Sequence, residues 1–205
     1  MSRRRIWNED AVMRVKSLDV LAVGNAIVDI FGQCGDDFLQ TNGIEKGVMT
    51  LLDAAGSARL YAALDKIGSP QLISGGSAAN TAVGVAAFGG SANFIGRVHD
   101  DDLGAAFRHD IKAAGVGFDQ PPASSGSPTA SSIILVTPDA ARSMNTFLGA
   151  SLEFEAGDLA FADAASAKII YLEGYLFDAP NGPAIFAEAA FLAEKHDVRL
   201  ALSLS

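Results

Sequence analysis

Cysteine is almost absent from this 205-residue sequence, which contains only Cys34. A single thiol forms no internal disulfide and no cysteine-based zinc site, so we expect it to be inert. Such sparse use of cysteine is typical of proteins kept in a reducing compartment. We therefore expect a cytoplasmic protein.

Positive charge is also scarce. The chain has 15 lysines and arginines against 24 aspartates and glutamates, which gives a net charge of −9 and an isoelectric point of about 4.7. An acidic surface repels the phosphates of nucleic acids, so we expect no nucleic-acid partner. Hydrophobic residues make up 49% of the chain, enough for the core of one large domain, alone or with a small appendage.

Apolar runs of membrane-spanning length are missing. The longest run near the start, residues 18–31, is broken by three polar residues, Asp19, Asn25 and Asp29. Three arginines at positions 3–5 resemble the start of a targeting signal, but residues 7–10 are polar or aromatic where an apolar stretch should follow. We expect residues 1–17 to form a tail, and we expect no membrane partner.

Several well-known catalytic patterns are absent as well. No lysine follows a glycine, which excludes a P-loop, and Gly24 lacks the further glycines of a dinucleotide fingerprint. The three histidines, His99, His109 and His196, are far apart and show no metal-ligand spacing. A Gly-x-Ser-x-Gly nucleophile elbow does not occur. We expect neither a resident metal nor a nucleophilic serine.

Strand-like and helical patterns alternate along the chain, which predicts a parallel sheet with helices on both faces. Strands are expected at 19–30, 71–74, 92–98, 168–172 and 198–204, and helices at 51–67, 78–88, 102–114, 159–165 and 183–196. Two segments, 32–50 and 127–148, do not fit the alternation. The first is broken by glycines and the second suggests a hairpin around Pro138, so we expect a second, small sheet.

A pair of glycines marks the first candidate site, in Gly75-Gly76-Ser77-Ala78-Ala79-Asn80. Two glycines allow a ligand to approach the backbone, and the following helix offers free N–H groups. Asn80 lies one turn into that helix, where its amide can reach the same ligand. The competing interpretation is a tight turn between strand and helix, with Ser77 as the cap.

The second candidate is Gly24-Asn25-Ala26-Ile27-Val28-Asp29. Asn25 and Asp29 fall near the carboxyl end of the first predicted strand, and ligands of open α/β sheets bind outside such ends. A carboxylate there can accept hydrogen bonds from neighbouring hydroxyls. The alternative is a turn asparagine and a surface aspartate.

The third candidate is the acidic stretch at 96–104, Gly-Arg-Val-His-Asp-Asp-Asp-Leu-Gly. Three adjacent carboxylates suggest a divalent cation, but they lack the alternating spacing of a calcium loop. We therefore expect Asp100, Asp101 and Asp102 to cap the next helix and to favour its positive end.

Taken together, these motifs resemble the amino-terminal part of the ribokinase or PfkB family of kinases. The order is Gly-Asn-x-x-x-Asp, Gly-Gly-x-x-x-Asn and Gly-Arg-Val-x-Asp-Asp-x-x-Gly, and residues 142–150 and 172–176 are similar to further family segments. The Gly-Asn start is closest to the adenosine-kinase-like branch. The resemblance covers residues 18–205 and implies a ribokinase-like three-layer αβα fold with a small β-sheet lid formed by segments around 32–50 and 127–148.

The resemblance also implies a site. Asn25, Asp29, Gly75, Gly76 and Asn80 are expected to bind sugar hydroxyls, with Glu173 bordering the pocket and Arg142 closing over the substrate from the lid. One departure is His99, which stands where the family motif usually has glycine and would crowd the turn if its φ were positive. In many family members the lid also pairs between subunits, so a homodimer is expected.

The family's second signature, an Asp-Thr-x-Gly-Ala-Gly-Asp-like stretch that carries the catalytic base, does not occur here; its nearest match is residues 155–158. We therefore expect no catalytic residue in this chain, and ATP and Mg²⁺ sites largely outside it. With a predicted strand at 198–204, we expect the sheet to be incomplete at the C-terminus and the chain to be a truncated form.

Two functions follow from these expectations. The first is an ATP-dependent sugar or nucleoside kinase that phosphorylates a hydroxymethyl group, with this chain carrying the sugar-binding half. The alternative is a non-catalytic sugar- or nucleoside-binding module, or an inactive remnant. A general base contributes roughly 10²–10⁴ in rate, so a chain without one would not turn over usefully.

Overall fold

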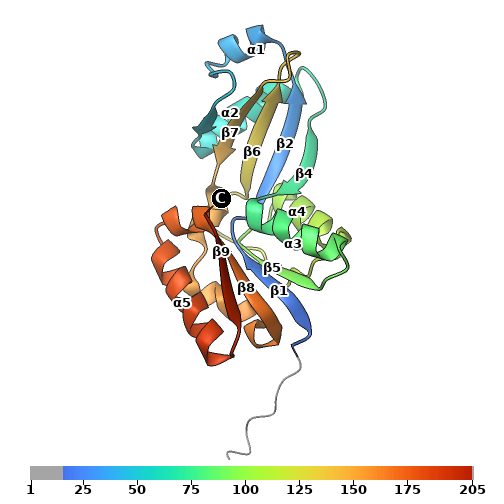
Figure 1. The fold of residues 1–205 in the computed structure, drawn as a ribbon. Helices are drawn as coiled ribbons and strands as arrows, with labels where there is room; N and C mark the ends of the chain where they lie inside the picture. The colour runs from blue at the N-terminus through green and yellow to red at the C-terminus, as the bar shows by residue number, and fades with distance from the viewer. Residues whose placement is uncertain (1–15, 205) are drawn as a thin grey trace, which may run out of the picture.

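The computed structural model describes residues 16–204, which form two β-sheets (Figure 1). The first sheet is parallel and has four strands in the order β5-β1-β8-β9; the other sheet, expected as a lid, is called the small sheet below although it has five strands. The strands of the parallel sheet are β1 (Leu18–Val23), β5 (Ala92–Ile95), β8 (Ala167–Glu173) and β9 (Arg199–Ser203).

Helices cover both faces of this parallel sheet, as alternating apolar and polar segments predict. The helix α3 (Ser77–Ala87) packs on one face, where Ala22 and Ala82 join one buried cluster. The opposite face carries α5 (Gly182–Lys195), and there Leu21 and Ile185 join a second buried cluster. Successive residues of β1 thus point into different cores, which is the pleat of a strand buried on both sides.

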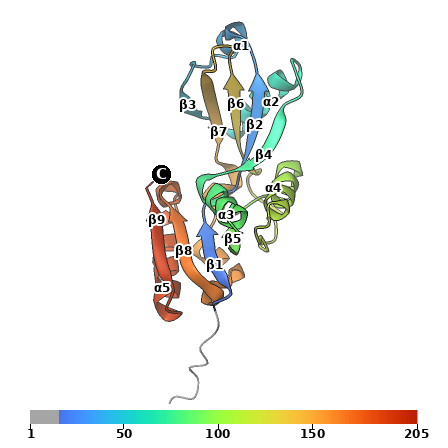
Figure 2. The same cartoon turned by 45° about the vertical axis from the view of Figure 1, so that its right-hand side comes forward.

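The second sheet has the order β3-β7-β6-β2-β4 and mixes parallel and antiparallel pairs (Figure 2). Its strands are β2 (Ile27–Gln33), β3 (Met49–Leu51), β4 (Gln71–Gly75), β6 (Ala130–Val136) and β7 (Arg142–Phe147). The helices α2 (Ala54–Asp65) and α4 (Asp102–Ala113) pack on one face, and α1 (Asp36–Thr41) lies at the tip.

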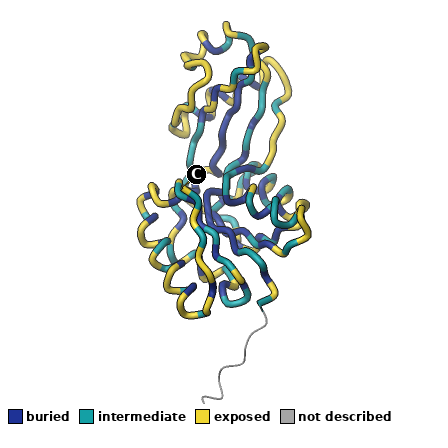
Figure 3. Tube along the Cα trace, in the orientation of Figure 1, coloured by how far each residue is buried: buried dark blue, intermediate teal, exposed yellow. Residues whose placement is uncertain are grey.

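The two faces of this second sheet differ in burial. Val28, Ile30, Ile133 and Leu135 are buried toward α2 and α4. On the opposite face Met49, Leu51, Ile73 and Met144 are all at least 39% exposed. Figure 3 shows that buried residues run along the inner strands, whereas exposed residues gather at the periphery of the molecule.

The predicted single strand at 19–30 is wrong: the structure divides it between the two sheets. The β1 ladder ends at Gly24, whose N–H donates to the Ile95 carbonyl at 3.2 Å, and the chain bends through Asn25 before β2 starts. Both strands are buried and apolar, so hydrophobicity alone does not mark the break. The same bend explains why 71–74 pairs with β2 in the small sheet instead of joining the parallel one.

Two smaller segments also differ from expectation. The predicted loop after residue 32 contains the helix α1, with two aspartates in its first turn. The helix expected at 159–165 is instead a pair of 3-10 helices, η2 (Ala156–Phe161) and η3 (Ala164–Ser166). Two further 3-10 helices are η1 (Gly149–Glu153) and η4 (Gly174–Asp178).

The acidic stretch at 100–102 caps α4, as expected. The Asp101 carboxylate accepts from the Gly104 N–H at 2.8 Å and also from the backbone and hydroxyl of Thr129. His99 is not among the described non-glycine residues with positive φ, so it fits its turn without that strain. Its N–H donates to the Thr129 hydroxyl at 2.9 Å.

The predicted tail, residues 1–17, lies mostly outside the described residues. Where the description begins, the Lys16 ammonium donates to the carbonyls of His196 and Asp197. Within residues 16–204, no helix has the length and apolar character needed to cross a membrane.

Candidate functional site

A cavity of about 450 Å³ lies at the junction of the two sheets. Its lining comes from β2, β3, β6 and β7 of the small sheet and from the loops that follow β1, β4, β7 and β8. A larger cavity, about 850 Å³, lies at the far end of the small sheet, but no charged side chain lines it. The junction cavity, in contrast, is lined by the carboxylates of Asp29, Glu173 and Asp178.

Asp29 is the carboxylate that faces this junction cavity. It is partly buried in β2, and in the described part of the chain it makes no hydrogen bond and no ion pair. Burial raises the pKa of the Asp29 carboxyl above its ordinary value. A partly desolvated carboxylate without a protein donor is costly unless a ligand supplies the hydrogen bonds, which makes Asp29 a candidate binding group.

Gly75 makes room for the Asp29 carboxylate, and Gly76 makes room for the Asn25 backbone. A Cβ atom on Gly75 would come within 2.5 Å of the Asp29 carboxylate oxygen. Gly76 has a φ of +98°, and a Cβ there would lie 2.3 Å from the Asn25 carbonyl oxygen. Both strain and space therefore require glycine at 76, while Gly75 lets the carboxylate rest against the backbone of β4.

Glu173 closes the bottom of the site. This side chain is 1% exposed, and its carboxylate accepts hydrogen bonds from the Asn25 N–H at 2.6 Å, the Ser77 hydroxyl at 2.6 Å and the Ala78 N–H at 2.8 Å. The carboxylate therefore occupies the positive N-terminus of α3. The expectation that this helix offers free N–H groups to a ligand is wrong for Ala78, because Glu173 has taken that donor.

Of the other predicted residues, Asn25 lines the cavity and Asn80 does not. Asn25 is 7% exposed, and its side-chain amide makes no hydrogen bond within the described residues. Asn80 is exposed in the first turn of α3, where its N–H donates to the Gly76 carbonyl. It shares a helix face with Ser77, three positions earlier, and Ser77 does line the cavity.

Arg142 lies at the other end of the small sheet. It pairs with Val136 at the start of β7, four residues before Thr146, which lines the cavity. Four residues of strand span about 13 Å. The structure thus brings together Asn25, Asp29, Gly76 and Glu173, with Gly75 behind them, and leaves Arg142 apart.

Several residues that line the cavity were not predicted from the sequence. Ser132, Thr146, Tyr175 and Asp178 line the cavity, as do apolar residues of β3 and of the loop after β7. The sequence carries little signal for them, since Ser132 is one of two serines in the apolar strand β6 and Thr146 lies among other polar residues of β7. Their convergence on Asp29 depends on strand register, which the sequence does not show.

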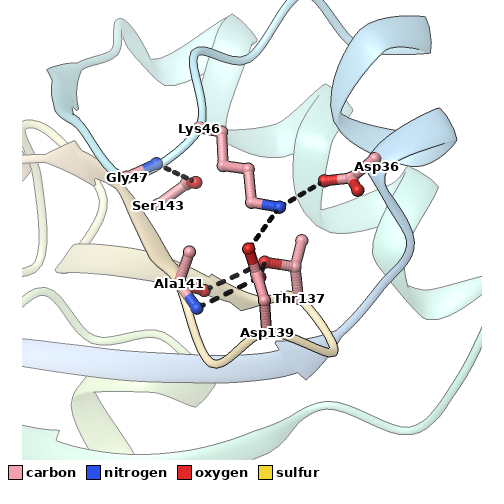
Figure 4. Close-up of polar contacts among 7 residues, drawn as sticks. All are labelled: Asp36, Lys46, Gly47, Thr137, Asp139, Ala141 and Ser143. Atoms are coloured by element: carbon pink, nitrogen blue, oxygen red, sulfur yellow. Dashed lines mark hydrogen bonds and ion pairs between the residues drawn. The ribbon is translucent and has the colours of Figure 1, made fainter.

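The wall formed by β3 is anchored by an ion-pair group at the tip of the small sheet (Figure 4). The Lys46 ammonium contacts Asp36 of α1 at 2.7 Å and Asp139 of the β6–β7 hairpin at 2.8 Å. The Gly47 N–H donates to the buried Ser143 hydroxyl at 2.9 Å. These contacts tie the segment before β3 to β7, so β3 stays in place although it has only three residues.

The described residues were compared with the metal site and the catalytic base that the resemblance implies. Residues 16–204 hold no cluster of three or more His, Cys, Asp or Glu arranged for a metal ion. The Asp158 carboxylate, the nearest match to the family's base, accepts from the Glu155 N–H at the start of η2 and lies 3.5 Å from Arg97. It serves η2 and does not line the junction cavity.

Comparisons with solved structures give the same fold. The adenosine kinase from Sinorhizobium meliloti matches with a TM-score of 0.80 and 47% identity, over 92% of this chain and 57% of that chain. A probable sugar kinase from Rhizobium etli CFN 42 matches at 0.81 and 44%, over 93% and 57%. The apo adenosine kinase of Trypanosoma brucei brucei, at 0.82 and 19% identity over 92% and 58%, shares the fold alone.

The chain thus spans about 57% of the length of the two more similar structures. No curated protein matches it. The expected ribokinase-like α/β fold is confirmed by these matches, and so is the likeness to the adenosine-kinase-like branch. A family model described as pfkB family carbohydrate kinase matches residues 49–205, and together with the 47% identity this shows that the chain belongs to the pfkB family of carbohydrate kinases.

Proposed function

We propose that this chain binds the acceptor substrate of an ATP-dependent sugar or nucleoside kinase. The observation that carries the proposal is the Asp29 carboxylate, which is partly buried at the junction cavity and has no donor within the described residues. Neighbouring hydroxyls of a ribose-like sugar are neutral donors that satisfy such a group. Hydrogen bonds to a charged acceptor are the stronger kind, about 1.5–3 kcal/mol each.

The residues around Asp29 would orient that sugar. The Asn25 amide offers both a donor and an acceptor, and the Gly76 backbone lies open to close approach. Glu173 would act by holding the backbone at Asn25 and Ala78 in place instead of touching the ligand. Asn80 would join from the face of α3 that it shares with Ser77. The proposal extends to Arg142 only if the substrate or the small sheet moves toward it.

Phosphoryl transfer to a hydroxymethyl group is the reaction that the family implies. ATP would supply the phosphoryl group, and the residues described here neither ligate magnesium nor include the catalytic base of the family. This chain's part is therefore to bind the acceptor, to exclude water from it and to hold its hydroxymethyl group in a fixed direction.

A nucleoside fits the cavity better than a free sugar. The apolar side chains of Ile27, Leu51 and Leu148 line one wall, and Tyr175, 61% exposed, stands at the edge. A base would cover these surfaces, whereas a pentose would leave them open. The matching protein from Sinorhizobium meliloti is described as an adenosine kinase, which is consistent with this choice.

The second candidate function is binding without catalysis. The same cavity and the same Asp29 would serve a binding module. Turnover separates the two functions: ADP release from ATP and adenosine supports the kinase, and adenosine binding without ADP release supports the module.

Isothermal titration calorimetry of the 205-residue chain with adenosine and with D-ribose tests the shared part of the proposal. We expect Asp29→Asn, which keeps the shape of the side chain, to weaken binding of both ligands about 10- to 100-fold. Asp65→Asn, at an exposed position of α2, is the matched control and should bind like the wild type. The proposal would be overturned if wild-type protein gave no heat of binding with either ligand.

We also propose a homodimer through the small sheet and a cytoplasmic location. The exposed apolar face formed by Met49, Ile73 and Met144 supports the dimer, because exposed apolar groups favour association. Light scattering should give twice the chain mass for the wild type, and the Met144→Lys variant should give the mass of a single chain.

The single cysteine supports a cytoplasmic location, which fractionation of the native cells would test.

A further inference from the structure

A row of side chains crosses the cavity face of the small sheet. The strand register pairs Asp29 with Ser132, Ser132 with Thr146 and Thr146 with Leu51. Residues paired in this way point to the same side of a sheet, and all four line the junction cavity. Neighbouring strands are about 4.8 Å apart, so Ser132 lies about 5 Å and Thr146 about 10 Å from Asp29 along the row.

Ser132 and Thr146 bond to each other and to no other group. Their hydroxyl oxygens are 2.9 Å apart, and either can be the donor. Across residues 16–204, neither hydroxyl makes a second hydrogen bond. Each hydroxyl has one hydrogen and two lone pairs, so the pair retains one hydrogen and three lone pairs after its mutual bond. Because the mutual bond can reverse, either residue can present the remaining hydrogen.

This pair is a polar spot in an apolar wall. Ser132 is 6% exposed, and Leu51 and Leu148 line the cavity on the same side as Thr146. Water therefore satisfies the remaining hydrogen of Ser132 poorly. A site built around such a group accepts a ligand that completes the hydrogen bond and strongly rejects one that cannot.

The distance along the row selects the part of the ligand that is read. A sugar ring is two to three bonds across, roughly 3–4 Å at about 1.5 Å per bond. A ring whose hydroxyls are held by Asp29 covers the Asp29 end of the row, and the part of the ligand beyond the ring lies toward Thr146 and Leu51. A ligand with a second ring system covers the whole row, including its apolar end.

We propose that Ser132 and Thr146 are a specificity-determining pair that hydrogen-bonds a heteroatom on the base of a nucleoside whose ribose is held at Asp29. This inference rests on the proposed function. Since the pair can donate or accept, it should take bases with either an amino or an oxo group at the edge that faces the small sheet.

The test is calorimetry on the 205-residue chain with three probes: adenosine, inosine and D-ribose. Thr146→Val replaces the hydroxyl by a methyl group of similar shape, and we expect it to weaken adenosine and inosine roughly 5- to 50-fold. D-Ribose should change by less than twofold. Thr146→Ser keeps the hydroxyl and should restore nucleoside binding to within about threefold.

The matched control is Ser131→Ala. Ser131 neighbours Ser132 in β6, but its hydroxyl faces α2 and pairs with Ser57 at 3.3 Å. Loss of that hydroxyl should leave all three affinities unchanged. Thermal melting of each variant shows whether it is folded, and Ser132→Ala gives a second route if Thr146→Val fails to fold.

The possible outcomes distinguish failure of the proposed function from failure of this inference. If wild-type protein binds none of the three probes, the proposed function fails and the inference fails with it. If wild-type protein binds them and Thr146→Val and Ser132→Ala bind equally well, only the inference is overturned. An equal loss for D-ribose and for the nucleosides would also overturn it, because the pair would then support the whole cavity and not read the base.

Discussion

The backbone N–H of Asn25 donates to the carboxylate of Glu173 at 2.6 Å, although 148 positions separate the two residues. The second oxygen of the same carboxylate binds the first turn of α3. One buried side chain thus fixes the bend after β1 and the start of the helix after the diglycine. Both sides of the candidate site depend on it.

Replacement of Glu173 by glutamine should destabilise the fold by about 2–3 kcal/mol. Its amide group would turn a donor toward donors that the carboxylate now satisfies, and a buried N–H left without an acceptor costs about 1–3 kcal/mol. Urea denaturation measures the change. Glu194→Gln, at an exposed position of α5, is the control and should be neutral within about 0.5 kcal/mol. Equal midpoints for the two variants would show that Glu173 has no such role.

Gly76→Ala and Gly84→Ala should act in opposite directions, although the two residues are only eight positions apart. At Gly76, positive φ and the nearby Asn25 carbonyl predict a loss of about 2–4 kcal/mol. Gly84 lies inside α3 with nothing near its missing Cβ, so alanine there should stabilise by about 0.5–1 kcal/mol. Melting temperatures compare the pair, and a neutral Gly76→Ala would contradict the structure at the diglycine.

Asp29→Asn should raise the thermal stability slightly while it weakens ligand binding. Burial raises the pKa of Asp29 in the folded state, so the folded protein takes up a proton more readily than the unfolded chain. Its contribution to stability is then present at acid pH and is lost as the pH rises through the raised pKa. The melting temperature of the variant should exceed that of the wild type at pH 7, and the gap should close toward pH 3.

Ligand affinity should show the opposite pH dependence. The ionised form of Asp29 accepts the hydroxyls, so the affinity for D-ribose should decrease as the pH falls through the raised pKa of this carboxyl. Calorimetry between pH 4 and pH 7 measures this. If the affinity for D-ribose did not change with pH, and the Asp29→Asn variant bound as tightly as the wild type at every pH, Asp29 would not be part of the site.

Lys46→Met should lower the melting temperature modestly, and the loss should shrink at high salt because exposed ion pairs are screened. Hydrogen bonding to Lys46 holds the pKa of Asp139 well below its usual range. The stability from this pair is therefore present above the unfolded pKa and is lost as the pH falls toward the folded pKa. Lys46→Arg keeps the charge and should melt with the wild type. A salt-independent loss would mean that packing of the lysine stem matters instead.

Many helices and strands could be predicted from hydrophobic periodicity and from the glycine and capping residues at their ends. The α2 helix starts where Asp53 caps it, and α4 ends where Gly115 adopts a φ of +84°. The start of α2 was predicted too early, at residue 51, because Leu51 belongs to β3. The end of α4 was predicted to within one residue because a glycine just past a helix is a local signal. The break between β1 and β2 could not be predicted, because both strands are buried and the bend at Asn25 is held by Glu173 from far along the chain.

The residues of the site also divide into those marked by local motifs and those brought together by strand pairing. Asp29 and Gly76 were predicted from motifs that are short in sequence. Ser132 and Thr146 were missed because they meet only through the pairing of β6 with β7 and β2. Arg142 was placed in the correct strand, but a strand has two ends, and the register puts this residue at the end away from the cavity.

The order of the strands along the chain has one more consequence. The polypeptide leaves the parallel sheet after β1, returns for β5, leaves again for β6 and β7, and returns for β8. No single cut separates the two sheets into consecutive stretches of gene. The small sheet is built from two discontinuous segments, residues 27–75 and 130–147, so exchanging it by protein engineering requires both segments to be grafted at once.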